Sequence, residues 1–102
     1  MNKMKTLSEF KTSLEANVPR DGFSPALTSL WYDGKGNWQR AHSQVDHLED
    51  KDSAWVHAYL HRKEGDLTNA NYWYRKAGKL RPTDSLEAEW ETLVLYFLAN
   101  DK

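Results

Sequence analysis

The sequence predicts an all-α fold of about six helices arranged in antiparallel hairpins. Apolar residues recur at three- and four-residue spacing through most of the chain, and the segments between these stretches carry helix-capping residues. No stretch shows the strict alternation of apolar and polar residues that marks a half-buried strand. A chain of 102 residues is long enough for one domain with one core.

The first helix is predicted at about residues 7–17. Thr6 and Glu9 have the spacing of a capping box, in which each side chain accepts a hydrogen bond from the other residue's backbone amide. The apolar stripe of this helix consists of Leu7, Phe10 and Leu14. Pro19 cannot continue a helix and therefore ends this one.

Residues 23–48 predict a pair of helices. Ser24 offers a hydroxyl to the free amides at the start of the first, and Pro25 is tolerated in its first turn. Gly36 turns the chain, and Asn37 caps the second helix. The residues expected to face inward are Ala26, Leu27, Leu30, Trp31, Trp38, Ala41, Val45 and Leu48.

A second pair is predicted at residues 53–64 and 67–77, after a charged link at 49–52. Asp66 caps the second member of this pair, and Gly78 is its natural C-terminal stop. An offset of 29 residues relates the two pairs, because it places both the turn glycine and the first buried alanine of one pair on those of the other. Such a unit cannot bury its apolar face alone and must stack on its neighbours.

The last helix, at about residues 84–100, has the most continuous apolar face. Asp84 and Glu87 again have the capping-box spacing. The apolar face consists of Leu86, Trp90, Leu93, Val94, Phe97 and Leu98. Glu87, Glu89 and Glu91 are expected on its solvated face. Taken with the inward positions of the two pairs, Trp38, Ala41, Ala70, Tyr74, Ala77, Trp90 and Phe97 are expected in the core.

The second pair also carries a pattern of small, turn, aromatic and proline positions. These are Ala58, Gly65, Asp66, Leu67, Ala70, Tyr74, Ala77 and Pro82, and in them the chain resembles a tetratricopeptide repeat. The resemblance implies a right-handed superhelix with a concave face for a partner, built from a degenerate repeat at about 23–48, a clearer repeat at about 53–82 and a C-terminal capping helix. The segment 55–78 is also similar to a small bacterial family of unassigned activity.

Charge and composition argue against two classes of partner. Fourteen Lys and Arg stand against fifteen Asp and Glu, so a net charge of −1 gives no field that would gather nucleic acid or anionic lipid. No apolar run approaches the roughly 20 residues that span a bilayer, and the N-terminus lacks a signal-peptide pattern. Cysteine is absent, which fits a reducing compartment. We expect a cytoplasmic protein that binds neither nucleic acid nor membrane.

One face of the helix at 53–64 predicts a binding groove. It carries Trp55, Tyr59, Arg62 and Lys63, which the resemblance places along the concave face. Aromatic rings and guanidinium groups often dominate contact energies. The alternative is that the two rings cover a neighbouring helix while the two cations form a solvated helix end.

The same helix carries a candidate metal or ligand site. His57, His61 and Glu64 lie four and three residues apart and therefore share one face, and imidazole and carboxylate are zinc ligands. His42, on the neighbouring helix, could supply a further ligand. The alternative is that His57 and His61 are structural, buried and neutral, with each ring nitrogen hydrogen-bonded.

No motif in the sequence indicates a reaction, since it has neither a phosphate-cradling glycine loop nor a recognisable nucleophile site. We expect a non-enzymatic module that binds a protein or peptide and needs no cofactor. Tyr72 and Trp73 are expected to be exposed, where they could meet a partner or a second copy of the chain. The alternatives are the small-ligand or metal site at the histidines and a purely structural part that self-associates.

Overall fold

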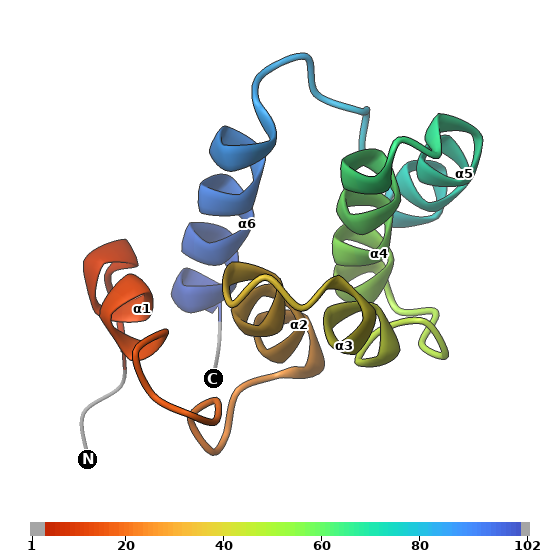
Figure 1. Ribbon diagram of the computed structural model, residues 1–102. Coiled ribbons are helices and arrows are strands. Elements are labelled where there is room, and N and C mark those ends of the chain that lie inside the picture. Colours follow the sequence, from red (N-terminus) through yellow and green to blue (C-terminus); the bar gives the residue numbers. More distant parts are fainter. Residues whose placement is uncertain (1–3, 101–102) are drawn as a thin grey trace.

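The computed structural model describes residues 4–100, which form six α-helices and their connecting loops (Figure 1). Within this range no residue belongs to a strand, so the predicted all-helical class is confirmed. The helices are α1 (Leu7–Ser13), α2 (Pro25–Gly34), α3 (Trp38–Ser43), α4 (Lys51–Glu64), α5 (Leu67–Ala77) and α6 (Leu86–Asn100). Across the described residues, none of these helices is both long and apolar enough to cross a membrane.

The helices form two hairpins and two covering helices. α2 packs on α3 and α4 packs on α5, each pair being joined by a short glycine turn (Figure 1). The chain then crosses from α5 to α6, which contacts both α2 and α4, while α1 packs on the outer side of α6. The right-handed superhelix implied by the tetratricopeptide resemblance stays a prediction.

Local capping chemistry sets most helix starts. The predicted capping box of Thr6 and Glu9 is formed, and the side chains of Ser24, Asn37 and Asp66 each accept a backbone amide of the following turn. Two predicted starts are wrong. α4 begins at Lys51, two residues early, because Asp50 accepts the amide of Ser53. α6 begins at Leu86 because the Ser85 hydroxyl, rather than Asp84, accepts the amide of Ala88.

Two helices are shorter than predicted, and both end beside a serine. α1 stops at Ser13 rather than near residue 17, and α3 stops at Ser43 before reaching Leu48. Each serine hydroxyl donates to the carbonyl three residues earlier, which competes with continuation of the helix. Beyond α1, the Lys35 ammonium donates to the carbonyls of Leu14 and Ala16.

The core lies mainly between α2, α4 and α6, with a smaller cluster of Ala58, Ala70 and Tyr74 between α4 and α5. Of the predicted core residues, six are buried: Ala41, Ala70, Tyr74, Ala77, Trp90 and Phe97. The seventh, Trp38, is only half-buried. Its indole Nε1 donates to the Leu60 carbonyl over 2.8 Å, so this ring fastens α3 to α4 at the surface instead of filling the centre.

Gly65 ends α4 in the left-handed conformation, with φ of 89°. An added Cβ would meet no atom within 4 Å, so the penalty of a side chain here is conformational. Gly65→Ala is therefore expected to lower the free energy of unfolding by about 1–2 kcal/mol in a urea titration. Gly65→Asn should lose less, because asparagine tolerates this conformation better. Equal losses in both variants would contradict the explanation.

Candidate functional site

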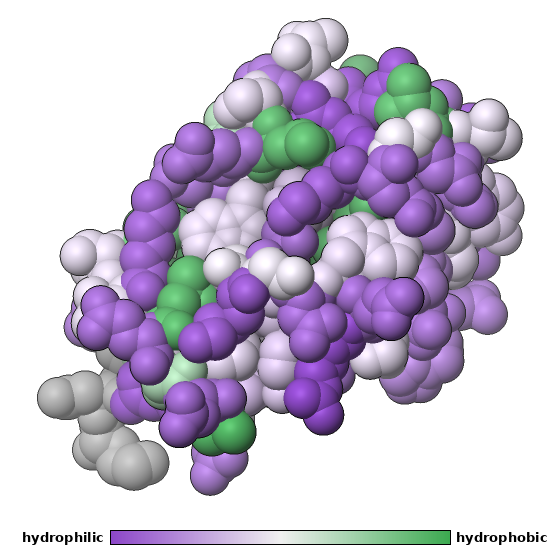
Figure 2. All heavy atoms as spheres, in the orientation of Figure 1, coloured by the Kyte–Doolittle hydropathy of each residue, from purple (hydrophilic) through white to green (hydrophobic). Residues whose placement is uncertain are grey.

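A cavity of about 460 Å³ opens between α1, α2, α4 and α6. Its lining residues are Lys11, Leu14, Asp33, Gly34, Tyr59, Lys63, Leu86, Glu87 and Trp90. Figure 2 shows the face between α6 and α4, where pale and hydrophobic side chains lie in a hollow flanked by hydrophilic ones. The cavity thus combines apolar walls with charged groups of both signs.

A buried carboxylate of α2 forms the polar part of this cavity. Asp33 is 4% exposed and accepts the Tyr59 hydroxyl over 2.6 Å and the Lys63 ammonium over 2.8 Å. Burial and the neighbouring Asp33 charge raise the pKa of the Tyr59 phenol, so it stays a neutral donor. Two residues predicted for a groove therefore line a cavity, and both bind the same carboxylate from α2.

A second buried carboxylate joins α6 to the α4–α5 hairpin. Glu89 is 3% exposed and accepts Arg62 Nη1 over 2.8 Å and the Tyr74 hydroxyl over 2.5 Å. Arg62 also donates to the backbone carbonyl of Asp84. The prediction that Glu89 lies on the solvated face of α6 is wrong, because the carboxylate is the internal partner of Arg62.

The four residues predicted for the groove lie in three different environments in the structure. Tyr59 is 2% exposed and Lys63 only partly exposed, and both line the 460 Å³ cavity. Arg62 is held by Glu89, and it lines neither this cavity nor a smaller one of about 120 Å³. Trp55 lines that smaller cavity, where the Lys79 ammonium lies 4.3 Å from its ring centroid. The four residues therefore do not form one continuous contact surface.

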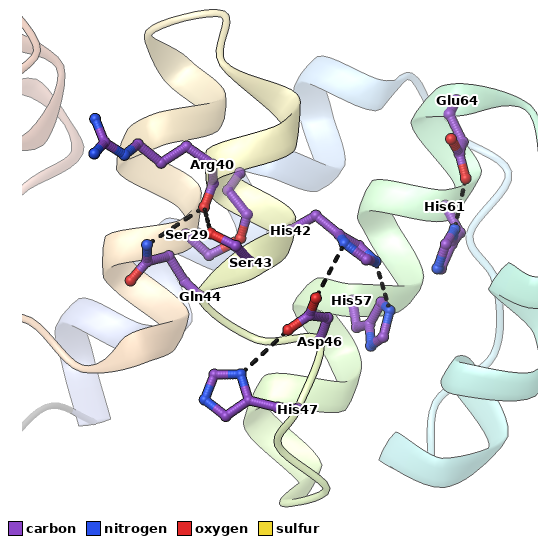
Figure 3. A network of polar contacts seen from close by, with 11 residues as sticks. Ser29, Arg40, His42, Ser43, Gln44, Asp46, His47, His57, His61 and Glu64 are labelled. Atoms are coloured by element: carbon purple, nitrogen blue, oxygen red, sulfur yellow. Dashed lines mark hydrogen bonds and ion pairs between the residues drawn. The ribbon is translucent and has the colours of Figure 1, made fainter.

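The histidines lie on the other side of α4, facing α3. His57 and His61 are buried, as predicted, and His42 of α3 points toward them (Figure 3). The His42 and His57 Nε2 atoms are 3.0 Å apart, and one ring nitrogen from each of the three residues lies within 4.8 Å of the other two. We name His42, His57 and His61 the histidine cluster.

Carboxylates and indoles surround the histidine cluster. His61 Nδ1 lies 2.7 Å from Glu64 Oε2, and His42 Nδ1 lies 3.7 Å from Asp46 Oδ2 (Figure 3). Glu64, predicted as a ligand alongside the histidines, instead contacts Nδ1 of His61. We call the Nδ1 atoms of His61 and His42, which face carboxylates, the outer nitrogens of these rings. The outer faces of the rings are covered by stacked indoles, Trp38 on His42 and Trp73 on His57.

Burial favours the neutral imidazoles of His57 and His42. It lowers the pKa of His57 to about 4, with further lowering by His42 and His61, and it also lowers the pKa of His42. The expectation that every ring nitrogen finds a hydrogen-bond partner is wrong for His57. Its Nδ1 is buried and has no partner among the described residues.

The two predicted exposed aromatics have different environments. Tyr72 is 47% exposed, with the Lys76 ammonium 5.7 Å from its ring centroid. Trp73 is half-buried, because its ring stacks on His57 at 4.1 Å between centroids. Only Tyr72 is therefore available as the surface contact that the sequence suggested.

Several site residues were missed by the sequence reasoning. Lys11, Leu14 and Glu87 also line the cavity. They lie near one another because α1 packs on α6, and no local sequence pattern indicates this packing. Glu89 did leave a signal, because it stands three residues after Leu86 and four before Leu93, within the apolar stripe of α6. An acid at such a position indicates a buried carboxylate with an internal partner.

No family model, no curated protein and no solved structure matches this chain. The tetratricopeptide resemblance therefore receives no support from these comparisons.

Proposed function

We propose that this chain is a non-enzymatic module that binds a short segment of a protein or peptide in the cavity between α1, α2, α4 and α6. The observation that carries the proposal is the cavity itself. Its volume of about 460 Å³ lies within the usual range for ligand sites, and apolar walls with a few converging polar groups are the usual lining.

The cavity offers complementary contacts to a peptide segment. Leu14, Leu86 and Trp90 line it and provide contact for one apolar side chain. Lys11 and Lys63 each donate to one carboxylate, and an ammonium group has three N–H donors, so both can also donate to peptide carbonyls or an acidic side chain.

Gly34 keeps the walls of the cavity in place. A Cβ at this position would lie 3.0 Å from Leu14 and 3.1 Å from Trp90, so any side chain would displace these two neighbours. The glycine is not required by its backbone conformation, because its φ is not positive. Close packing of the cavity walls therefore accounts for a residue without a side chain here.

Binding is expected to depend on Leu86, which lines the cavity at the start of α6. Peptides enriched from a random displayed library on the wild-type protein should bind Leu86→Lys at least about tenfold more weakly by fluorescence anisotropy. The reason is that a charge would have to be desolvated against the bound apolar side chain.

Leu95→Lys is the matched control, since it makes the same change on the same helix at a residue that is 48% exposed and does not line the cavity. It should bind the enriched peptides as the wild type does. Failure to enrich any peptide, or equal losses in the two variants, would reject the cavity as the binding site.

A further inference from the structure

We propose that His42, His57 and His61 form a three-histidine site for a divalent transition-metal ion of the class that prefers imidazole, with Zn²⁺ as the representative ion. This site is separate from the cavity. It joins α3 to α4, whereas the cavity lies between α1, α2, α4 and α6.

The ligand spacing is close to what such an ion needs. With Zn–N bonds of about 2.0–2.1 Å, two nitrogens of a tetrahedral site lie about 3.3 Å apart. His42 and His57 already hold their Nε2 atoms 3.0 Å apart, and the His61 nitrogen lies within 4.8 Å of both. The His61 ring, which lies on the adjacent turn of α4, would have to move closer to complete the set.

The outer nitrogens of two rings are oriented as in known metal sites. A carboxylate only accepts hydrogen bonds, so Glu64 fixes the His61 proton on Nδ1 and leaves its Nε2 lone pair free. The Asp46 carboxylate lies 3.7 Å from His42 Nδ1, beyond hydrogen-bond distance, and favours the same tautomer only through its charge. Carboxylates on the outer nitrogens of ligand histidines are common at metal sites, where they also balance the charge of the ion.

Contacts within the described protein leave one ring nitrogen of the histidine cluster without a hydrogen-bond partner. With the His42 proton directed toward Asp46, the short contact between the two Nε2 atoms makes His57 the donor, and its buried Nδ1 is left without a partner. Structural histidines ordinarily contact a carbonyl, hydroxyl or carboxylate at each nitrogen. An ion bound to both Nε2 lone pairs would replace this contact, with the His57 proton then on Nδ1, where the described residues offer it no acceptor.

The surroundings suit a bound ion. Stacked Trp38 and Trp73 fix the rings of His42 and His57 and exclude water from their outer faces. The His42 side chain is 25% exposed, whereas His57 and His61 are buried, so a fourth ligand such as water would enter beside His42.

The test uses metal-free full-length protein, prepared with a chelator that is then removed, and titrated with Zn²⁺ in a calorimeter. We expect one ion per chain with micromolar or tighter affinity, and a thermal unfolding midpoint that rises with Zn²⁺. Co²⁺ should quench tryptophan fluorescence, since two indoles contact the ligand rings. Saturation only at millimolar zinc, or a stoichiometry well above one, would overturn the proposal.

The fourth histidine of the chain supplies a matched control. His47 lies five residues after His42, its side chain is 68% exposed, and it belongs to no candidate ligand group in the described part of the chain. His47→Gln should bind zinc as the wild type does. His42→Gln should bind it more than about 100-fold more weakly, because an outer hydrogen-bond partner of a ligand alone accounts for about 10- to 100-fold.

His42→Gln is the first choice of variant because His42 is only half-buried, and circular dichroism checks that the variant is folded. Glu64→Gln tests the positioning role of the carboxylate without removing a ligand, and should weaken zinc binding about 10- to 100-fold. Unchanged zinc affinity in folded His42→Gln, or equal losses in His42→Gln and His47→Gln, would show that the ion binds elsewhere and overturn the site.

Discussion

Replacing Arg62 by methionine is expected to lower the free energy of unfolding by about 3–5 kcal/mol, because removing one partner of a buried ion pair leaves the other charge uncompensated. The remaining charge is Glu89, which is 3% exposed and would keep only the Tyr74 hydroxyl as donor. Methionine retains much of the volume and apolar contact of the arginine side chain, so the loss should reflect the charge. Urea unfolding at neutral pH measures it.

Lys11→Met is the control for this prediction. Lys11 forms a shorter ion pair with Glu91, at 2.6 Å, but their side chains are 46% and 32% exposed, and exposed pairs contribute about 0–1 kcal/mol. The double variant Arg62→Met with Glu89→Met should recover part of the loss, because the uncompensated charge of this pair is gone although the buried Tyr74 hydroxyl loses its acceptor. A loss below about 1 kcal/mol for Arg62→Met would contradict the structural role assigned to this arginine.

Helix number, most of the caps and the glycine stop of α5 could be predicted because each is decided by residues that are close in sequence. Asp66 and Gly78 bound α5 at the predicted residues, since one caps an amide three positions ahead and the other adopts the left-handed conformation that follows a helix. The predicted C-terminal ends of two helices were wrong because a serine hydroxyl bonds a backbone carbonyl and competes with continuation of the helix, as at Ser13 and Ser43.

Partners far apart in sequence could not be predicted from spacing. The periodicity of α4 correctly placed His57 and His61 on one buried face. It gave no information on whether α3 presents His42 at that face, because α3 is short and is held by contacts to distant residues, such as the bond from Trp38 to the Leu60 carbonyl. For the same reason the spacing assigns Arg62 to a groove, since its partner Glu89 lies 27 positions away.

Metal-free protein is expected to lose stability on mild acidification, by about 2 kcal/mol between pH 7 and pH 5 and about 3 kcal/mol by pH 4. His57 carries the prediction, because burial and the neighbouring His42 and His61 lower its pKa to about 4 in the folded state, against about 6.5 when unfolded. Well above pH 6.5 the ring is neutral in both states and contributes nothing. As the pH falls below about 6.5, His57 binds a proton in the unfolded chain but stays neutral in the folded chain until the pH nears 4. Unfolding therefore becomes more favourable as pH falls.

Urea unfolding in the presence of a chelator, at steps between pH 7 and pH 5, measures this loss before carboxylates titrate. The lowered pKa of His42 acts in the same direction, whereas Asp46 opposes both effects. His57→Phe keeps a ring that can stack on Trp73 but cannot be protonated, so its stability should fall much less over this range. His47→Gln, which alters an exposed histidine, should retain the wild-type dependence. If His57→Phe retained it as well, the acid sensitivity would have to arise from groups other than His57.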